Sequence, residues 1–439
     1  MATLTTTILS TSPHNTSLGA GSEKGANNTS IRHAKQGTKN DPLEPLLPLS
    51  FMRATAIVSG KGAQRWADGH PWIFRSDLIT APSIDAAAVT VLDNRRRPIG
   101  TALWSPESEI SLRLIDRDPD ATIDEHWWHD RIEHAVRRRT AIGPEASAYR
   151  LIHGEGDGLP SLVCDRYDKW LVVQLLSAGL ERYRRDIVAA LLAVTGAQGI
   201  LARNDPPVRA REGLPRETTL LSGDVPQEIE VHEHGVRYLA APWTGQKTGA
   251  FLDQREARRR IGTYARGRAL DCFSYHGSFA LHLARNADHV IAIDSSAAAL
   301  ARAADNARRN GFGTIDCVEA NAFDYLRDRE RERAMFDTIV LDPPAFAKSR
   351  ASLTSALRGY HEINLRAMRL MAPGGTLYTA SCSYHLTKPL FLEMIERAAA
   401  DSGRRLSLRE MIGQSLDHPE ILTIPETGYI KGAILEAMD

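Results

Sequence analysis

The first regular pattern in the chain is a series of short apolar runs between Phe51 and about Asp118, each broken by turn residues. Apolar and polar residues alternate within these runs, which is typical of β-strands with one buried face. The runs read A-T-A-I-V, W-I-F, A-A-V-T-V-L-D, A-L-W and I-S-L-R-L-I. The pattern predicts a small all-β domain over residues 52–122.

The next segment, residues 123–240, mixes helical and strand patterns. From Asp124 the string W-W-H-D-R-I-E-H-A-V-R-R-R-T places apolar residues at helical spacing. Glycines and Pro160 then separate strand-like runs, and a further helix is predicted from Glu181 to about Thr195. These elements predict an α+β middle domain.

From Gly267 onward, strands and helices alternate. The strands read A-L-D-C-F, H-V-I-A-I-D, I-D-C-V-E-A, F-D-T-I-V-L-D and T-L-Y-T-A-S. The clearest helix is predicted from Ser295, as N-cap, to Asn310, with Gly311 as its stop. Such alternation predicts an α/β fold whose parallel sheet is covered by helices on both faces.

The last two predicted strands, L-S-L-R-E-M-I and Y-I-K-G-A-I-L-E-A, have no helix between them. A closing antiparallel hairpin of this kind marks the class I methyltransferase form of the Rossmann-like fold. We therefore predict a methyltransferase domain over residues 241–439.

Charge, composition and cysteine spacing restrict the partners and the location that can be expected. The 439 residues carry no formal net charge, so any contact with nucleic acid must come from local basic patches. No apolar run is long enough to cross a bilayer, and residues 1–51, rich in Ser, Thr, Asn and Gly, are predicted to be a disordered tail. The four cysteines are widely spaced and form no metal-binding pattern, which predicts a reducing cytoplasmic location and no metal.

Ligands of such sheets bind beyond the carboxyl ends of the strands. The first strand ends in D-C-F-S-Y-H-G-S, which has one glycine and is not a G-x-G-x-x-G pyrophosphate cradle. A ligand without phosphate, such as S-adenosylmethionine (SAM), suits this turn better than a nicotinamide dinucleotide. Asp294 ends the second strand and is predicted to bind a ribose, with helix capping as its alternative role. Asn321 follows the third strand as a candidate contact to adenine.

Two chemically suited side chains follow the fourth and fifth strands. L-D-P-P-A-F-A-K-S presents Asp342, and S-C-S presents Cys382. A pyrimidine C5 atom attacks a methyl sulfonium only after a thiolate has added to C6, and Cys382 is the candidate nucleophile. Asp342 is the candidate acid toward the ring. Buried packing is the alternative for any cysteine, and we accept it for Cys272 and Cys317, which lie inside strands.

Several segments together resemble the RlmI-type class I methyltransferases, which make 5-methylcytosine in 23S ribosomal RNA. They are G-Q-K-T-G-A-F-L-D-Q-R, D-C-F-S-Y-H-G-S-F, L-D-P-P-A-F-A-K-S and S-C-S, with G-H-P-W-I-F resembling the family's RNA-binding PUA domain. The resemblance implies that Cys382 is the nucleophile and that Asp342 contacts the target base. It also implies that a segment closing over SAM is formed by Lys247, Thr248, Phe251, Asp253 and Gln254, and that the SAM pocket is lined by Asp271, Phe273, Ser274, Tyr275, Gly277 and Asp294. The candidate cofactor contacts from the strand ends are Asn321, Asp342 and Pro343. His276 and Ser278 depart from the family pattern, which has Thr and Gly there.

The expected partner is 23S rRNA, with no membrane contact and with a homodimer as one oligomeric state. Candidate RNA contacts are His70, Trp72, Arg75, Arg203, Arg209 and Lys348, with core packing as the alternative role of Trp72. Three alternatives stay open: uracil-C5 methylation, guanine methylation with Cys382 idle, and a non-catalytic RNA-binding assembly factor. The base that removes the C5 proton is unassigned.

Overall fold

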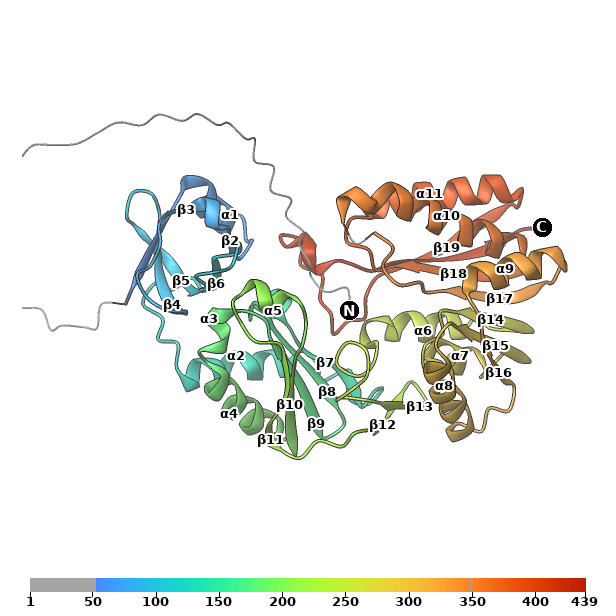
Figure 1. Ribbon diagram of the computed structural model, residues 1–439, viewed down its shortest axis with the longest axis horizontal. Helices are drawn as coiled ribbons and strands as arrows, with labels where there is room; N and C mark the ends of the chain where they lie inside the picture. The colour runs from blue at the N-terminus through green and yellow to red at the C-terminus, as the bar shows by residue number, and fades with distance from the viewer. Residues whose placement is uncertain (1–52, 348) are drawn as a thin grey trace, which may run out of the picture. The chain divides into compact units, whose positions relative to one another are not determined.

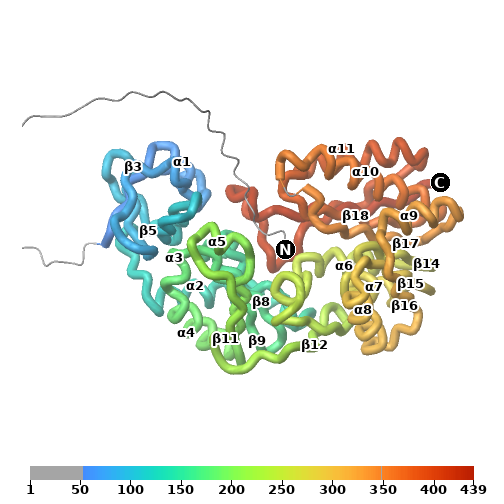
Figure 2. Tube along the Cα trace, viewed as in Figure 1, coloured from blue at the N-terminus to red at the C-terminus, as the bar shows by residue number. Residues whose placement is uncertain are grey.

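The computed structural model describes residues 53–347 and 349–439. The predicted disordered tail and Lys348 lie outside the described residues. Three β-sheets and one separate hairpin make up the described part of the chain. The trace in Figure 2 runs from the first sheet through the second and the hairpin into the last.

The first sheet has six strands in the order β2-β6-β5-β4-β1-β3. Its elements are β1 (Thr55–Val58), α1 (Gly60–Ala67), β2 (Trp72–Ile73), β3 (Leu78–Thr80), β4 (Ala87–Leu92), β5 (Pro98–Trp104) and β6 (Leu112–Asp116). The core of this domain includes Trp66, Ile73 and Trp104. The alternating runs of the sequence therefore form a small β domain, but one that also carries the helix α1.

The middle region contains a five-stranded sheet in the order β11-β10-β9-β8-β7. Its elements are α2 (Glu125–Arg137), β7 (Ala148–His153), β8 (Leu162–Tyr167), β9 (Trp170–Leu175), α3 (Ala178–Glu181), α4 (Arg184–Thr195), β10 (Gly199–Asn204), α5 (Val208–Arg211) and β11 (Glu217–Gly223). Trp128 and Ile132 of α2 share one core with Ile187 and Leu191 of α4 and with Leu171 of the sheet. The region is α+β, as predicted. The helix predicted from Glu181 to Thr195 is α4, which begins at Arg184, whereas Glu181 ends the short helix α3.

The hairpin β12 (Ile229–Glu233) and β13 (Val236–Ala240) leads into the last sheet. That sheet has seven strands in the order β16-β15-β14-β17-β18-β20-β19. Its elements are α6 (Arg255–Gly262), β14 (Arg268–Cys272), α7 (Ser278–Leu283), β15 (His289–Asp294), α8 (Ala297–Arg309), β16 (Ile315–Glu319), α9 (Ala322–Arg331), β17 (Phe336–Leu341), α10 (Leu353–Arg369), β18 (Met371–Ser381), α11 (Lys388–Ser402), β19 (Leu406–Ile412) and β20 (Lys431–Ala437).

Strand β20 is antiparallel to both of its neighbours, whereas β14 to β18 run parallel. The predicted closing hairpin is therefore confirmed. Alternate residues of β14 face opposite sides of the sheet: Leu270 packs with α9, α10 and α11, and Ala269 packs with α6 and α7. Figure 1 shows these two layers of helices on the two faces.

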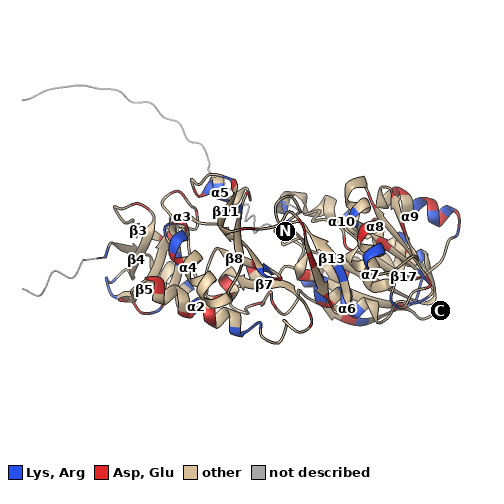
Figure 3. Ribbon diagram, turned by 90° about the horizontal axis from the view of Figure 1, so that it is seen from below, with Lys and Arg blue, Asp and Glu red and all other residues tan. Residues whose placement is uncertain are grey.

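The helix predicted from Ser295 begins two residues later. Ser296, not Ser295, is the N-cap of α8, and its hydroxyl accepts a hydrogen bond from the Ala299 amide at 3.3 Å. The backbone amide of Ser296 itself donates a hydrogen bond to Asp294 Oδ1 at 2.9 Å. In the described part of the chain, no helix is long and apolar enough to span a membrane. Basic and acidic residues are interspersed along α6 and α9 (Figure 3).

Candidate active site

Asp342 and Cys382 follow two neighbouring parallel strands of the seven-stranded sheet. Asp342 comes directly after β17, and Cys382 directly after β18, with Leu341 paired to Thr379. Because the carboxyl ends of parallel strands lie at one edge of the sheet, both side chains belong to the same edge. The sequence predicted this placement for both residues.

Asp342 is buried and held by a short relay of side chains. The Gln254 amide donates to Asp342 Oδ1 at 2.8 Å, and the Tyr378 hydroxyl donates to Gln254 Oε1 at 3.0 Å. Burial, and then the charge of Asp253, raise the pKa of Asp342 to about 6. The carboxyl group can therefore exchange a proton near neutral pH.

The backbone around Cys382 is fixed by three hydroxyl groups. Ser381 Oγ donates to the Tyr360 hydroxyl at 2.9 Å, and the Ser383 amide donates to Ser381 Oγ at 3.2 Å. Ser383 Oγ accepts from the Ala347 amide at 3.1 Å, which ties the segment to the loop after Asp342. Burial, and then the charge of Asp342, raise the pKa of the Cys382 thiol, so the thiolate needs a compensating cation.

The loop before α6 gathers most of the residues that the resemblance assigned to a closing segment. Lys247 Nζ lies 2.5 Å from Asp253 Oδ2, and Lys247 stacks 4.5 Å above the centre of the Phe251 ring. Thr248 Oγ1 donates to Asp165 Oδ2 of β8 at 2.5 Å, so the loop is anchored to the middle sheet. Burial alone would raise the pKa of Asp253, but the Lys247 ammonium outweighs it and holds that pKa far below its usual range.

The turn after β14 presents a carboxylate with one unused oxygen. Asp271 Oδ2 accepts from Ser274 Oγ at 2.7 Å and from the Ala280 amide at 3.0 Å, whereas its buried Oδ1 has no partner. Burial raises the pKa of Asp271 to about 7. An orphaned buried carboxylate oxygen fits the ammonium group of the methionine part of SAM.

Backbone conformation shapes the same turn. Phe273 and Tyr275 adopt positive φ angles of 65° and 51°, and Gly277 has φ of 82° at the start of α7. A Cβ atom on Gly277 would lie 2.9 Å from the Cβ of Ala303, so glycine permits α7 to approach α8 closely. The unusual His276 is buried and stacks on Tyr238, with 5.2 Å between ring centres.

The remaining predicted SAM residues lie at the neighbouring strand ends. Asp294 Oδ2 accepts from the Tyr275 amide at 2.9 Å, which joins the ends of β14 and β15. Asn321 caps α9 by accepting from the amide of Phe323 at 2.9 Å, so its carbonyl oxygen is already used locally. Pro343 follows Asp342 in the loop after β17. These residues fit SAM: the Asp271 carboxylate suits its ammonium group, and Asp294 provides a second carboxylate at the end of the next strand.

The predicted RNA contacts need correction at three positions. Trp72 is buried and its indole donates to Glu155 at 2.9 Å. Arg209 is fully buried against Glu181, and Arg203 is buried with its guanidinium donating to Pro242 O at 2.6 Å. All three side chains are buried and donate to acceptors inside the protein, so they are not available to RNA.

The two other described candidates lie nearer the surface. His70 is partly buried, and its Nε2 lies 3.0 Å from a carboxylate oxygen of Glu426. Arg75 is exposed and donates to the Ser108 carbonyl oxygen at 3.0 Å. Lys348 lies outside the described residues.

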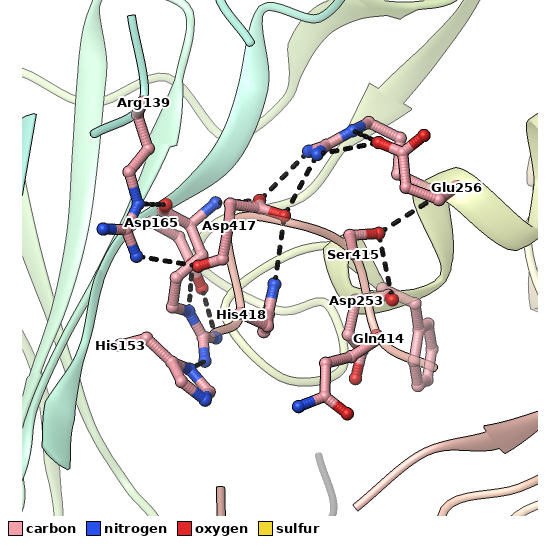
Figure 4. Close-up of polar contacts among 12 residues, drawn as sticks. Arg139, His153, Asp165, Asp253, Glu256, Gln414, Ser415, Asp417 and His418 are labelled. Atoms are coloured by element: carbon pink, nitrogen blue, oxygen red, sulfur yellow. Dashed lines mark hydrogen bonds and ion pairs between the residues drawn. The ribbon is translucent and has the colours of Figure 1, made fainter. Parts of the chain in front are cut away.

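A buried ionic cluster centred on Asp417 was missed by sequence reasoning (Figure 4). Arg255 of α6 donates to both Asp417 carboxylate oxygens at 3.0 and 3.1 Å, and the Arg150 amide of β7 donates at 2.7 Å. Arg139 adds a bond to the Asp417 carbonyl oxygen at 2.8 Å. Burial would raise the pKa of Asp417, but His418 and then Arg255 outweigh it and hold it well below its usual range.

A cavity of about 600 Å³ opens beside the Cys382 segment. Its lining includes Arg350, Tyr384, His385, Lys388, Leu422 and Lys431. Lys431 is the second group that sequence reasoning missed: it is buried, although a lysine that begins a strand is usually exposed. Its sequence signal is its position at the start of the apolar run Gly432–Leu435. Within the described residues, no group of three or more His, Cys, Asp or Glu side chains could hold a metal ion.

The fold and the site define a class I, SAM-dependent methyltransferase with an N-terminal β domain. The sequence model of the S-adenosylmethionine-dependent methyltransferase family matches residues 149–421, and that of the PUA-like domain matches residues 56–117. The chain therefore belongs to this methyltransferase family, and the predicted PUA domain is confirmed. Two structures share the fold at 19% identity, each covering 87% of this chain and 100% of its own: a Streptococcus mutans protein described as a SAM-dependent methyltransferase, and a methyltransferase complexed with SAH, with TM-scores of 0.74 and 0.76.

Relatives with higher sequence identity show which methyltransferase family the chain belongs to. A protein of Pseudoalteromonas translucida named ribosomal RNA large subunit methyltransferase I is 37% identical over 374 residues, which is 83% of this chain and 94% of that protein. The protein of the same name from Aeromonas salmonicida is 37% identical over 377 residues, which is 84% of this chain and 95% of that protein. The chain is thus a member of the ribosomal RNA large subunit methyltransferase I family.

Proposed function

We propose that the protein transfers a methyl group from SAM to C5 of a cytosine in 23S ribosomal RNA, through a covalent bond between Cys382 and C6 of the base. The supporting observation is the placement of Cys382 and Asp342 after adjacent strands, at the edge of the sheet where Asp271 offers a site for SAM. The names of the relatives support a large-subunit rRNA substrate.

Cys382 supplies the nucleophile. Its thiolate adds to C6, and the electron pair of the C5–C6 double bond moves so that C5 becomes nucleophilic. SAM, held through Asp271, supplies the methyl group as an electrophile when it is bound. C5 then loses its proton to a base, the C5–C6 double bond forms again, and the thiolate leaves.

Asp342 suits the acid role in this scheme. With a pKa near 6, it can hold a proton against N3 of the ring while negative charge develops there. Gln254 keeps the carboxyl group in one orientation through the bond at 2.8 Å. Thiolate formation is favoured by rising pH and the protonated acid by falling pH, so a bell-shaped pH profile is expected.

The cavity whose lining begins at Tyr384, two residues after Cys382, suits the strand that carries the target base. Arg350 and Lys388 bring positive charge, and the half-exposed Tyr384 offers a face for base stacking. Single-stranded nucleic acid is bound by this combination of cations and aromatic rings.

The test is incubation of the full chain with labelled SAM and unmodified 23S rRNA, followed by nucleoside analysis. Methylated cytosine is expected, and methylated uracil or guanine would contradict the proposal. RNA containing 5-fluorocytosine should give a covalent complex that resists denaturation. Cys382→Ala should abolish both, whereas the matched control Cys317→Ala should keep both, because Cys317 lies inside β16.

A further inference from the structure

Lys431 is a buried lysine directly beside the proposed nucleophile. It begins β20 and pairs across the sheet with Ser381, the residue before Cys382. Its ammonium donates to the Ser383 carbonyl oxygen at 2.6 Å and to the Tyr429 carbonyl oxygen at 2.8 Å. Lys431 thus contacts the chain on both sides of Cys382, by strand pairing with Ser381 and by a hydrogen bond to Ser383.

Lys431 differs from the neighbouring lysines in its lack of a carboxylate partner among the described residues. Among the described residues no carboxylate lies within ion-pair distance of its ammonium, whereas Lys247 is paired with Asp253 at 2.5 Å and Lys388 with Glu420 at 3.0 Å. A buried cation without a carboxylate partner is costly. An anion that forms beside it during a reaction would remove that cost.

We propose that Lys431 is a positioning residue that holds the Cys382 backbone and supplies the positive charge that stabilises the Cys382 thiolate. This inference rests on the proposed function, because only a nucleophilic role makes the thiolate necessary. When Cys382 ionises, its proton leaves to water and the ammonium keeps its own. The pair of groups then carries no net charge inside the protein.

Charged groups from several elements act on this pair. Burial lowers the pKa of Lys431 to about 8; the Cys382 charge opposes this, Lys388 of α11 adds to it, and Glu420 opposes it. Burial, and then Asp342 after β17, raise the pKa of the Cys382 thiol, and Lys247 lowers it. Tyr384, His385 and Arg350 line the cavity into which Lys431 opens. With a neutral residue at position 431, β20 would supply no cation to offset the rise in the thiol pKa that burial and Asp342 cause.

The test measures the thiol without RNA or SAM. The full chain is treated with iodoacetamide between pH 6 and 10, and modification of each cysteine is quantified by peptide mass spectrometry. Lys431→Gln should lower the Cys382 rate at pH 8 about tenfold, equivalent to about one pKa unit. Lys431→Arg, which keeps the charge, should stay within about threefold of the wild-type rate, since a threefold change is about half a pKa unit.

Two controls separate the charge from other effects. Lys388→Gln removes a half-exposed lysine of the same cavity and should leave the Cys382 rate within about twofold, about 0.3 pKa unit. The half-buried Cys317 should react at the same rate in every variant that is folded. If Lys431→Gln does not fold, the comparison of Lys431→Arg with Lys388→Gln still decides, because a tenfold loss in the arginine variant overturns the proposal.

Equal Cys382 rates in Lys431→Gln and Lys431→Arg would also overturn it. In methylation assays Lys431→Gln should lower kcat and leave KM for RNA unchanged. Absence of methylcytosine in the wild type, with the alkylation result intact, would instead contradict the proposed function alone.

Discussion

Arg258 connects three parts of the catalytic half through one guanidinium group. It donates to both carboxylate oxygens of Glu233 at 2.7 and 2.6 Å and to the Phe251 carbonyl oxygen at 2.7 Å. Both charged side chains are almost completely buried, at 2% and 1% exposure. Burial would raise the pKa of Glu233, but Arg258 and then His282 outweigh it and hold that pKa well below its usual range.

We predict that Arg258→Met lowers the free energy of unfolding by about 3 kcal/mol. Removing one partner of a buried ion pair generally costs about 3–5 kcal/mol, because the other charge stays buried without compensation. The lower end applies here, since His282 Nε2 remains 3.0 Å from Glu233 and can take up a proton. The matched control is Arg260→Met, whose side chain is 43% exposed beside Glu410 and should cost no more than about 1 kcal/mol.

Urea unfolding followed by circular dichroism gives both values at pH 7.5. The double variant Arg258→Met with Glu233→Gln should recover part of the loss, because the second change removes the uncompensated carboxylate. SAM affinity should fall in Arg258→Met as well, since the Phe251 carbonyl belongs to the loop of Lys247 and Asp253. Equal losses in Arg258→Met and Arg260→Met would refute the reasoning.

Three further outcomes are expected. SAM should bind more weakly at pH 6 than at pH 8 in calorimetry, because Asp271, with a pKa of about 7, loses its charge as pH falls; Asp271→Asn should bind weakly at both, and a pH-independent wild type would contradict this. Gln254→Leu should lower kcat about tenfold through loss of one hydrogen bond to Asp342, a carboxyl that must stay oriented; unchanged kcat would count against the relay. Glu233 and Asp253 have depressed pKa values, so their contribution to stability is complete above about pH 4.5 and is lost below it; a melting temperature that stays constant from pH 5 to pH 3 would contradict this.

Most of the catalytic fold could be predicted from the sequence, because strands and helices leave local patterns of apolar residues. Strand and helix periods predicted the parallel sheet, and the missing helix before β20 predicted the antiparallel closing strand. Asp342 and Cys382 could be placed at one edge because strand ends of a parallel sheet meet there. The cap of α8 was misplaced by one residue, since Ser295 and Ser296 are equally suited by type.

The buried cations could not be predicted in the same way. Arg203, Arg209 and Arg255 were either read as surface residues or not singled out, because an arginine in sequence is most often exposed. Each is buried against acceptors far away in the chain, such as Asp417 for Arg255. Lys431 belongs to the same group, and its role emerges only from the pairing of β20 with β18. Long-range pairing leaves no period or motif in the sequence.

The anchoring of Thr248 to Asp165 has a practical consequence for the smallest working fragment of this enzyme. A chain cut at residue 241 would keep the seven-stranded sheet but lose Asp165, and with it the hydrogen bond at 2.5 Å that fixes the loop before α6. It would also remove Glu233 from Arg258. The family match begins at residue 149, ahead of both lost partners. A truncation that retains the middle sheet is thus the one from which to seek crystals or minimal enzymes.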